Sequence, residues 1–169
     1  MFNSFVMDLH RTTFLLLALI FASSAFAQSD LVHNSCKELN TLYAGSYRFH
    51  VNNEQQLEVE FYNSSGNFRQ DMVYLDFLDP EMVTYNSEEN AVSIRCAESD
   101  NKCIDKEIYK LDVVKHSSRI NLQQENIETA NRTIELIKEV ILAHRVEQEE
   151  VEKKNTKMRK GKNETRKKR

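Results

Sequence analysis

Between residues 47 and 122 the chain alternates apolar and polar side chains with a period of two. Residues 47–51 and 57–61 alternate clearly, and the turn-forming residues 52–54 lie between them. Successive side chains of a β-strand point to opposite faces, so this period predicts strands with one face in a core and the other in water. The apolar runs follow one another too closely for helices to fit between them, which predicts an antiparallel meander.

Seven strands are expected from this pattern. They cover residues 47–51, 57–61, 71–78, 82–85, 91–96, 107–114 and 119–122. The segments between them are rich in Asn, Asp, Ser, Gly or Pro, residue types that favour turns. Residues 63–67, Asn-Ser-Ser-Gly-Asn, form the clearest turn. In the run 107–114, Tyr109, Leu111 and Val113 are expected to share one face.

After residue 126 the apolar residues change to a helical spacing. The stripe contains Ile127, Ala130, Ile134, Leu136, Ile137, Val140 and Ile141. Spacings of three and four put these side chains on one side of an α-helix, which can then cover the sheet. Asn126 is a suitable N-cap, and the helix is expected to continue to about Lys154 as a solvated rod. A coiled-coil dimer is less favoured, because only about two heptads are apolar and coiled coils need three or four.

The first 27 residues have the form of an export signal. Residues 14–22 are an uninterrupted apolar run preceded by Arg11, and Ala25-Phe26-Ala27 is the small-x-small pattern that signal peptidases cut. As a helix this run spans about 14 Å, too short for a bilayer core of about 30 Å. We therefore expect a mature chain that begins near Gln28 and is periplasmic or secreted. A start at Met7 would keep the same apolar core.

These features divide the chain into four expected parts. Residues 1–27 are the signal peptide, and 28–45 form an N-terminal helical segment ended by Gly45. Residues 46–146 hold the strands and their closing helix. Residues 147–169 form a charged helix extension followed by a disordered basic tail.

The end of the chain is strongly cationic. From Lys153 to Arg169 the net charge is +9, whereas Met1–Glu152 carries −12. The cationic residues are Lys153, Lys154, Lys157, Arg159, Lys160, Lys162, Arg166, Lys167, Lys168 and Arg169. An anionic membrane or envelope surface would attract them, each cation contributing up to about 1 kcal/mol at close range. Nucleic acid is a less suitable partner, because the segment has no aromatic residue on which bases could stack. A solubilising tail that folds back onto the acidic body is an equally weighted alternative.

The chain contains three cysteines, and an oxidising compartment favours their pairing. Cys96 and Cys103 flank a short polar loop and are the expected disulfide partners. Cys36 is then left over. A buried free thiol is the favoured interpretation, and an intermolecular bridge that forms a homodimer is the alternative.

The order of seven short antiparallel strands and one amphipathic C-terminal helix resembles the pleckstrin-homology-like superfold. It is also similar to small exported bacterial proteins with a strand meander, a Cys…Cys loop and a closing helix. The resemblance covers Tyr47 to about Ala143. It implies an α+β fold, in which the helix caps a partly closed barrel, and a binding-module role. Residues 52–56 of the first hairpin loop lack the Lys or Arg of phosphoinositide-binding members, and the helix lacks their tryptophan, so inositol-phosphate recognition is not implied.

No segment carries a recognisable catalytic, cofactor or metal signature. The sequence has no Gly-rich phosphate loop, no Gly-x-Ser-x-Gly turn and no His-Glu-x-x-His pair. The histidines beyond the leader lack metal-ligand spacing: His33, His50, His116 and His144. His50 and His116 are expected at the surface and His144 at the rim of the helix stripe. Acidic residues in 76–81 and 98–101 lack the spacing of a calcium loop.

The sequence therefore favours an exported, non-enzymatic binding or accessory module without a cofactor, which contacts a protein partner or an anionic surface. Two alternatives stay open. One is a small secreted hydrolase, with a site formed by dispersed carboxylates or by Cys36 with His116. The other is a structural dimer linked through Cys36.

Overall fold

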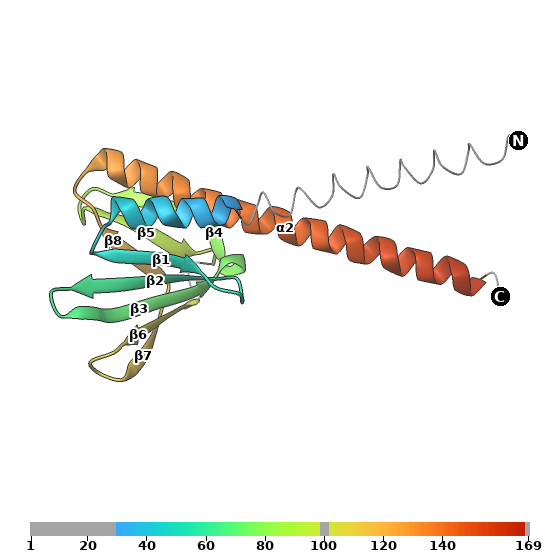
Figure 1. The fold of residues 1–169 in the computed structure, drawn as a ribbon, viewed down its shortest axis with the longest axis horizontal. Coiled ribbons are helices and arrows are strands. Elements are labelled where there is room, and N and C mark those ends of the chain that lie inside the picture. Colours follow the sequence, from blue (N-terminus) through green and yellow to red (C-terminus); the bar gives the residue numbers. More distant parts are fainter. Residues whose placement is uncertain (1–29, 99–101, 168–169) are drawn as a thin grey trace, which may run out of the picture.

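The computed structural model describes residues 30–98 and 102–167. Over these residues the chain is α+β, with eight antiparallel strands in two sheets and a long C-terminal helix (Figure 1). The expected signal peptide, residues 1–27, lies outside the described residues, as do Lys168 and Arg169. Most side chains after Lys153 also lie outside them.

Five strands form the larger sheet in the order β1-β2-β3-β6-β7. They are β1 (Tyr47–Val51), β2 (Gln56–Asn63), β3 (Gly66–Tyr74), β6 (Ile104–Ile108) and β7 (Val113–Ser117). In β2, buried Leu57, Val59 and Phe61 alternate with half-buried Glu58 and Glu60, as the period of two predicts. One face of this sheet therefore contributes to the core.

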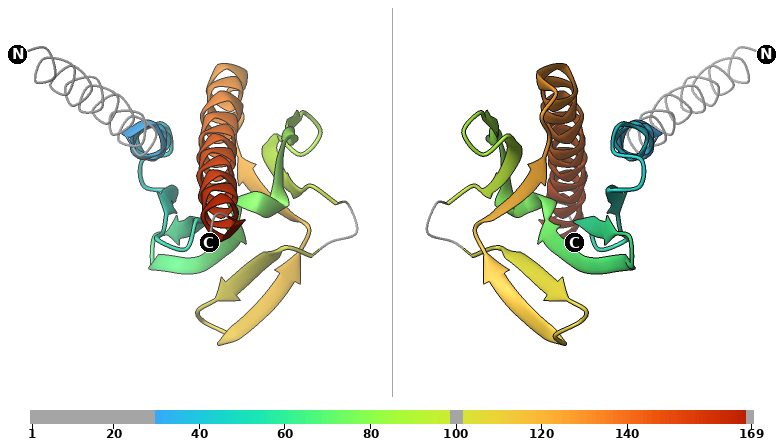
Figure 2. Two further views of the ribbon diagram at one scale, coloured as in Figure 1. Left: turned by 90° about the vertical axis from the view of Figure 1, so that its right-hand side faces the viewer. Right: turned by 90° about the vertical axis from the view of Figure 1, so that its left-hand side faces the viewer.

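Three strands form the smaller sheet in the order β4-β5-β8. They are β4 (Leu78–Asn86), β5 (Ala91–Cys96) and β8 (Arg119–Gln123), and the 3-10 turn η1 (Leu75–Phe77) leads from β3 into β4. β5 is central, and residues 91–94 are buried on both of its faces. β8 follows β7 after a single residue, Ser118, so the chain passes there from one sheet to the other (Figure 2).

Tight turns between the strands depend on residues that accept a left-handed backbone. Asn90 and Asp112 have φ angles of 47° and 50°, and Gly66 has a φ of 103°. Asn and Asp tolerate this region better than other side chains do, because their short polar groups bond to nearby backbone. The turn after β4 also uses Asn86, whose Oδ1 accepts a hydrogen bond of 2.9 Å from the backbone N–H of Glu88.

The C-terminal helix α2 (Ile127–Lys167) covers β4, η1 and part of β5. Its buried residues are Ala130, Thr133, Leu136, Ile137, Val140, Ile141, Ala143 and His144. The predicted apolar stripe is thus confirmed as a core face, except that Ile127 is 51% exposed. Asn126 is the N-cap, since its Oδ1 accepts hydrogen bonds from the backbone N–H groups of Glu128 and Thr129 at 2.9 and 3.0 Å.

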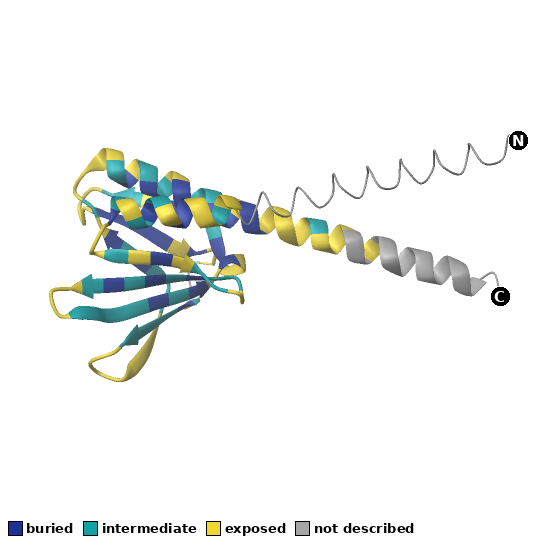
Figure 3. Ribbon diagram, in the orientation of Figure 1, coloured by how far each residue is buried: buried dark blue, intermediate teal, exposed yellow. Residues whose placement is uncertain are grey.

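The N-terminal helix, residues 30–42, lies beside α2 and shares its core (Figures 1 and 3). Arg132 of α2 donates two hydrogen bonds, of 2.6 and 2.9 Å, to the carboxylate of Glu38. The hydroxyls of Thr133 and Tyr43 are 3.1 Å apart in the interior. The two helices and the two sheets therefore enclose one core.

Several sequence predictions need correction. The structure has eight strands rather than seven, because the run 107–114 is not one strand: β6 ends at Ile108, the chain turns, and β7 begins at Val113. The strands are not a simple meander, since β3 pairs with β6 and β5 pairs with β8. Within the described residues the strands form no closed barrel. α2 also continues to Lys167, where composition predicted disorder after Asn155.

Candidate functional site

A groove of about 560 Å³ opens between the two sheets near the passage from β7 to β8. Its walls come from β1, β2, β3, β6 and β7 of the larger sheet, from β8 of the smaller sheet, and from Ser46 just before β1. The lining residues are Ser46, Tyr47, Phe61, Tyr62, Phe68, Arg69, Lys106, Ser117, Arg119, Asn121 and Gln123. Three of these side chains are cationic and none is acidic. A volume of this size lies within the usual range of small-molecule sites, about 300–1,000 Å³.

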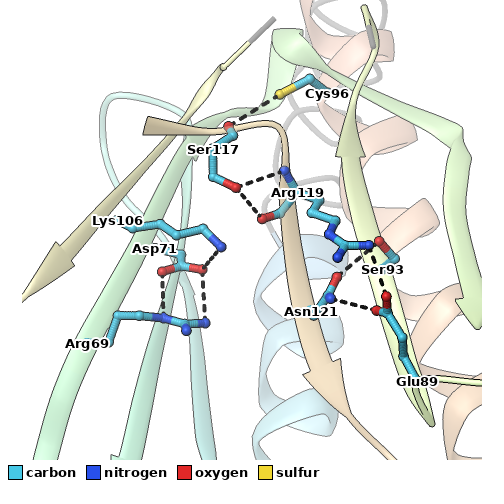
Figure 4. A network of polar contacts seen from close by, with 9 residues as sticks. All are labelled: Arg69, Asp71, Glu89, Ser93, Cys96, Lys106, Ser117, Arg119 and Asn121. Carbon is cyan, nitrogen blue, oxygen red and sulfur yellow. Dashed lines mark hydrogen bonds and ion pairs between the residues drawn. The ribbon is translucent and has the colours of Figure 1, made fainter. Parts of the chain in front are cut away.

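A buried carboxylate lies beneath the cationic wall. Asp71 of β3 is 0% exposed and sits on the inner face of the sheet, opposite Val59 of β2 and Lys106 of β6. Arg69 holds it with two contacts, Nε to Oδ1 at 2.9 Å and Nη2 to Oδ2 at 3.2 Å. The Lys106 ammonium is 3.5 Å from Oδ2 (Figure 4). One carboxylate therefore positions two cations that face the groove.

Burial changes the proton affinity of this cluster. It raises the pKa of Asp71, against the opposing effect of Arg69 and Lys106. It also lowers the pKa of Lys106, although the neighbouring carboxylate opposes that change. Both shifts have the same cause, since a buried group loses hydration that favours its charged form. Burial therefore disfavours the charged forms of Asp71 and Lys106, and their mutual attraction opposes this effect.

Aromatic rings form the other part of the larger-sheet wall. The Arg69 guanidinium carbon lies 3.5 Å from the centre of the Phe61 ring. Tyr47 and Phe68 make edge contacts with Phe61, at centroid distances of 5.1 and 6.4 Å. A guanidinium over a ring is held by cation–π attraction and dispersion. The Phe61 ring therefore holds the Arg69 side chain in place together with the Asp71 carboxylate.

The polar face of β8 supplies the opposite wall. Ile120 and Leu122 point into the core and are 0% exposed, so Arg119, Asn121 and Gln123 point the other way. Glu89 accepts hydrogen bonds from Arg119 at 3.3 Å and from Asn121 at 3.0 Å. Arg119 is thus paired at the outer rim, where its side chain is still 43% exposed.

The disulfide lies beside this groove. Cys96 and Cys103 form a disulfide, which is the expected pairing. Cys96 ends β5 of the smaller sheet, and Cys103 precedes β6 of the larger sheet. The Cys96 N–H donates to the Ser118 carbonyl at 3.0 Å. The bond therefore links the two sheets close to the point where the chain passes between them.

A second pocket, of about 340 Å³, contains the remaining cysteine. The lining includes Cys36, His33, His50 and His144. Cys36 is 7% exposed, and burial raises the pKa of its thiol to about 11. The thiol is therefore protonated near neutral pH and is a poor nucleophile.

The histidines of the described residues are not grouped to hold a metal ion. His144 is 3% exposed, so its expected place at a rim was wrong; its Nε2 lies 2.8 Å from Asp76 Oδ1, and this contact ties α2 to η1. His116 is exposed, as predicted, and bonds Asp105 at 2.6 Å on the β6–β7 hairpin rather than lining the Cys36 pocket. Among residues 30–98 and 102–167, no three His, Cys, Asp or Glu side chains are placed to hold a metal ion.

The acidic segments have structural partners. Asp76 contacts His144, and Asp79 Oδ1 accepts a hydrogen bond of 3.0 Å from the Glu81 N–H within a turn. Residues 99–101 of the second acidic segment lie outside the described residues. In the tail, Lys153 Nζ donates to Glu149 Oε2 at 3.1 Å, and the other nine predicted cations have no described side chain.

Sequence reasoning missed the groove residues. Arg69 and Asp71 share the strand phase of Val73, and Lys106 shares that of Ile104 and Ile108. The available signal was that these charged residues occupy alternating positions otherwise held by apolar residues. A charge on the core side of a strand requires a partner of opposite charge. The partners lie on strands that are not consecutive, so their meeting was not visible from spacing.

No helix in the described part of the chain is long and apolar enough to cross a membrane. Comparison with known protein families, with curated proteins and with solved structures finds no match to this chain.

Proposed function

We propose that this chain is an exported, non-enzymatic binding module that holds a small anionic ligand in the groove between its two sheets. The observation that carries the proposal is the composition of the groove wall: Arg69, Lys106 and Arg119 line it and no acidic side chain does. Arg and Lys bind carboxylates and phosphates through charge-assisted hydrogen bonds, which are about twice as strong as neutral ones. Asp71 holds Arg69 and Lys106 in place before a ligand arrives.

Cationic side chains that are already held in place favour binding, because a ligand has to restrict their motion only a little further. The side chains of Arg69 and Lys106 are only 24% and 20% exposed. Their conformational entropy is therefore lost on folding, and a ligand does not have to restrict them again. Export fits this role because a ligand-binding module outside the cytosol meets free solutes directly.

The cationic tail, Lys153–Arg169, is the second part of the proposal. We propose that it contacts an anionic membrane or envelope surface, while α2 holds it away from the body. A helix rises about 1.5 Å per residue, so the segment 147–167 places these charges well beyond the sheets. Removing Lys153–Arg169 should abolish salt-sensitive binding to anionic vesicles and leave ligand binding in the groove unchanged. Undiminished vesicle binding would remove the tail from the proposal.

The alternatives have less support. A hydrolase based on Cys36 would need a thiolate, which burial of this thiol disfavours. A dimer bridged through Cys36 would need the N-terminal helix to expose a side chain that is 7% exposed. The binding-module role implied by the pleckstrin-homology-like resemblance agrees with the proposal, but the groove and not that resemblance supports it.

The groove can be tested by ligand-induced stabilisation of the mature chain. Small carboxylates, phosphate esters and sulfonates would be screened for a rise in Tm at constant ionic strength. A ligand at one hundred times its Kd stabilises the fold by about 2.7 kcal/mol, which raises Tm by several degrees. Arg119→Gln should reduce the shift, whereas Lys110→Gln, an equal charge change on an exposed turn residue, should preserve it.

Two results would contradict the proposal. One is that no anion class raises Tm at millimolar concentration. The other is an equal shift in the Arg119→Gln and Lys110→Gln variants, because general charge attraction would then explain it.

A further inference from the structure

We infer that the groove selects a ligand with a single negative charge and an apolar body, such as a free aliphatic or aromatic monocarboxylate, over a dianionic phosphate. This inference rests on the proposed anion-binding function and specifies its ligand class. Three properties of the groove support it: its net charge, its aromatic wall and its neutral polar groups.

The first property is the charge that remains after internal pairing. Asp71 contacts both Arg69 and Lys106, so this cluster carries one surplus positive charge. Arg119 is paired with Glu89 and leaves no surplus. A monoanion beside Arg69 and Lys106 makes the cluster neutral. A dianion would leave a net negative charge beside a buried carboxylate, and like charges in a poorly hydrated site repel strongly.

The second property is the aromatic share of the wall. Tyr47, Phe61, Tyr62 and Phe68 all line the groove, and three of them are in ring contact with one another through Phe61. Phe61 is only 4% exposed beneath Arg69, so the aromatic surface that meets water belongs to the half-buried Tyr47, Tyr62 and Phe68. An inorganic anion at the cationic cluster would leave these three rings in contact with water. An apolar ligand body would cover them and gain the free energy of removing apolar surface from water.

The position of Arg69 joins these two properties. Its guanidinium lies over Phe61 while Nε and Nη2 contact Asp71, so the cationic cluster borders directly on the rings. A ligand whose anionic head meets Lys106 and Arg69 therefore places its body along the aromatic wall. Ser117 of β7 and Asn121 and Gln123 of β8 supply neutral polar groups that add no charge.

The test compares four probes with the mature wild-type chain by isothermal titration calorimetry at pH 8. Octanoate, octyl phosphate and octanol share one apolar body and differ in head charge, and inorganic phosphate has the charge without the body. At this pH octanoate is a monoanion and octyl phosphate is mainly a dianion. We expect octanoate to bind at least about tenfold more tightly than each of the other three probes.

Variants then locate the binding. Lys106→Met removes the surplus charge but keeps an apolar stem, and should reduce octanoate affinity to the level of octanol. Lys106→Arg keeps the charge and should retain octanoate binding. Lys110→Met removes a cation from the exposed turn between β6 and β7 and should have no effect. If Lys106→Met does not fold, the comparison of the four probes with the wild-type chain still tests the inference.

The outcomes separate this inference from the proposed function. Equal or tighter binding of octyl phosphate or inorganic phosphate would overturn the inference and leave anion binding in place. Equal binding of octanol and octanoate would also overturn it, because the charge would then not contribute. An absence of binding by every anionic probe would overturn both.

Discussion

The carboxylate of Asp71 lies 2.9 Å from the guanidinium of Arg69 on the inner face of one strand, where the alternation of β3 would otherwise place apolar side chains. Lys106 of β6 completes the cluster from the neighbouring strand. A charged group in this position needs a partner of opposite charge, because moving an isolated ion from water into the protein interior costs a large amount of free energy. The cluster of Arg69, Asp71 and Lys106 therefore distinguishes the lining of this groove from an ordinary apolar strand face.

Asp71 should make the stability of the fold depend on pH in a defined direction. Burial raises its pKa above the ordinary 3.8 in spite of the two cations. The native state then binds this proton more tightly than the unfolded chain, so the contribution of Asp71 to stability falls as the pH rises from about 3.8 through the native pKa. The unfolding free energy of the wild type minus that of Asp71→Asn, from urea denaturation, should decrease over this interval and then level off.

The comparison with Asp71→Asn removes the titration of the other carboxylates, which both proteins share. A difference that increases with pH would mean that Arg69 and Lys106 outweigh burial. The charged carboxylate would then stabilise the fold through its two ion pairs.

Packing of α2 on the sheets should be the main source of its stability. Ile141 is 0% exposed, and its neighbour Leu142 is 49% exposed. Ile141→Ala should lower the free energy of unfolding by about 2–4 kcal/mol, because it removes buried methyl groups and leaves a cavity. Leu142→Ala should change it by less than about 0.5 kcal/mol. Similar losses for both variants in chemical denaturation would show that α2 is not docked as described.

The disulfide should stabilise the body by limiting the unfolded chain. Closing so short a loop contributes about 2–3 kcal/mol by chain entropy. Cys96→Ser with Cys103→Ser should therefore lower the denaturation midpoint, and a reductant should lower the midpoint of the wild type but not that of the double variant. Cys36→Ala is the control and should keep the response to reductant. A wild type that is insensitive to reductant would mean that Cys96 and Cys103 are not paired.

The sequence was most informative where a pattern is local. The stripe of α2, its cap at Asn126 and the alternation of β2 depend on residues close in the chain, and each was predicted. The β6–β7 hairpin was missed because Tyr109, Leu111 and Val113 continue the alternation, while the backbone turns at Asp112 with a φ of 50°.

Long-range pairing explains the other differences. Which strands become neighbours depends on how the whole core closes, so the β3–β6 and β5–β8 pairs could not be deduced from spacing. The groove depends on those pairs. Lys106 reaches Asp71 only because β6 lies beside β3, and Arg119 faces them only because β8 follows the passage between the sheets. The candidate site was therefore hidden. The expected strands matched β1, β2 and β8 closely, but the expected strands 71–78 and 107–114 overlap β3 and β6 only in part and leave out Arg69 and Lys106.

Cys36 should be unreactive in the native protein. Its thiol is buried and has a pKa of about 11, so at pH 8 only a small fraction is thiolate. Alkylation by iodoacetamide should be at least about one hundred times slower than for an ordinary exposed thiol with a pKa near 8.5, and should become fast in denaturant. Rapid alkylation of the folded chain, or a Cys36-dependent dimer on non-reducing electrophoresis, would show that this side chain is accessible.

The claim of a ligand-binding groove is tested most directly by titrating octanoate into ¹⁵N-labelled protein that consists of residues 28–169 and following amide chemical shifts. We predict saturable shifts at Arg69, Lys106 and Arg119 and at the neighbouring aromatic residues Phe61 and Phe68, with little change along α2. Shifts that are confined to the tail or to the Cys36 pocket, or an unperturbed spectrum, would contradict the account.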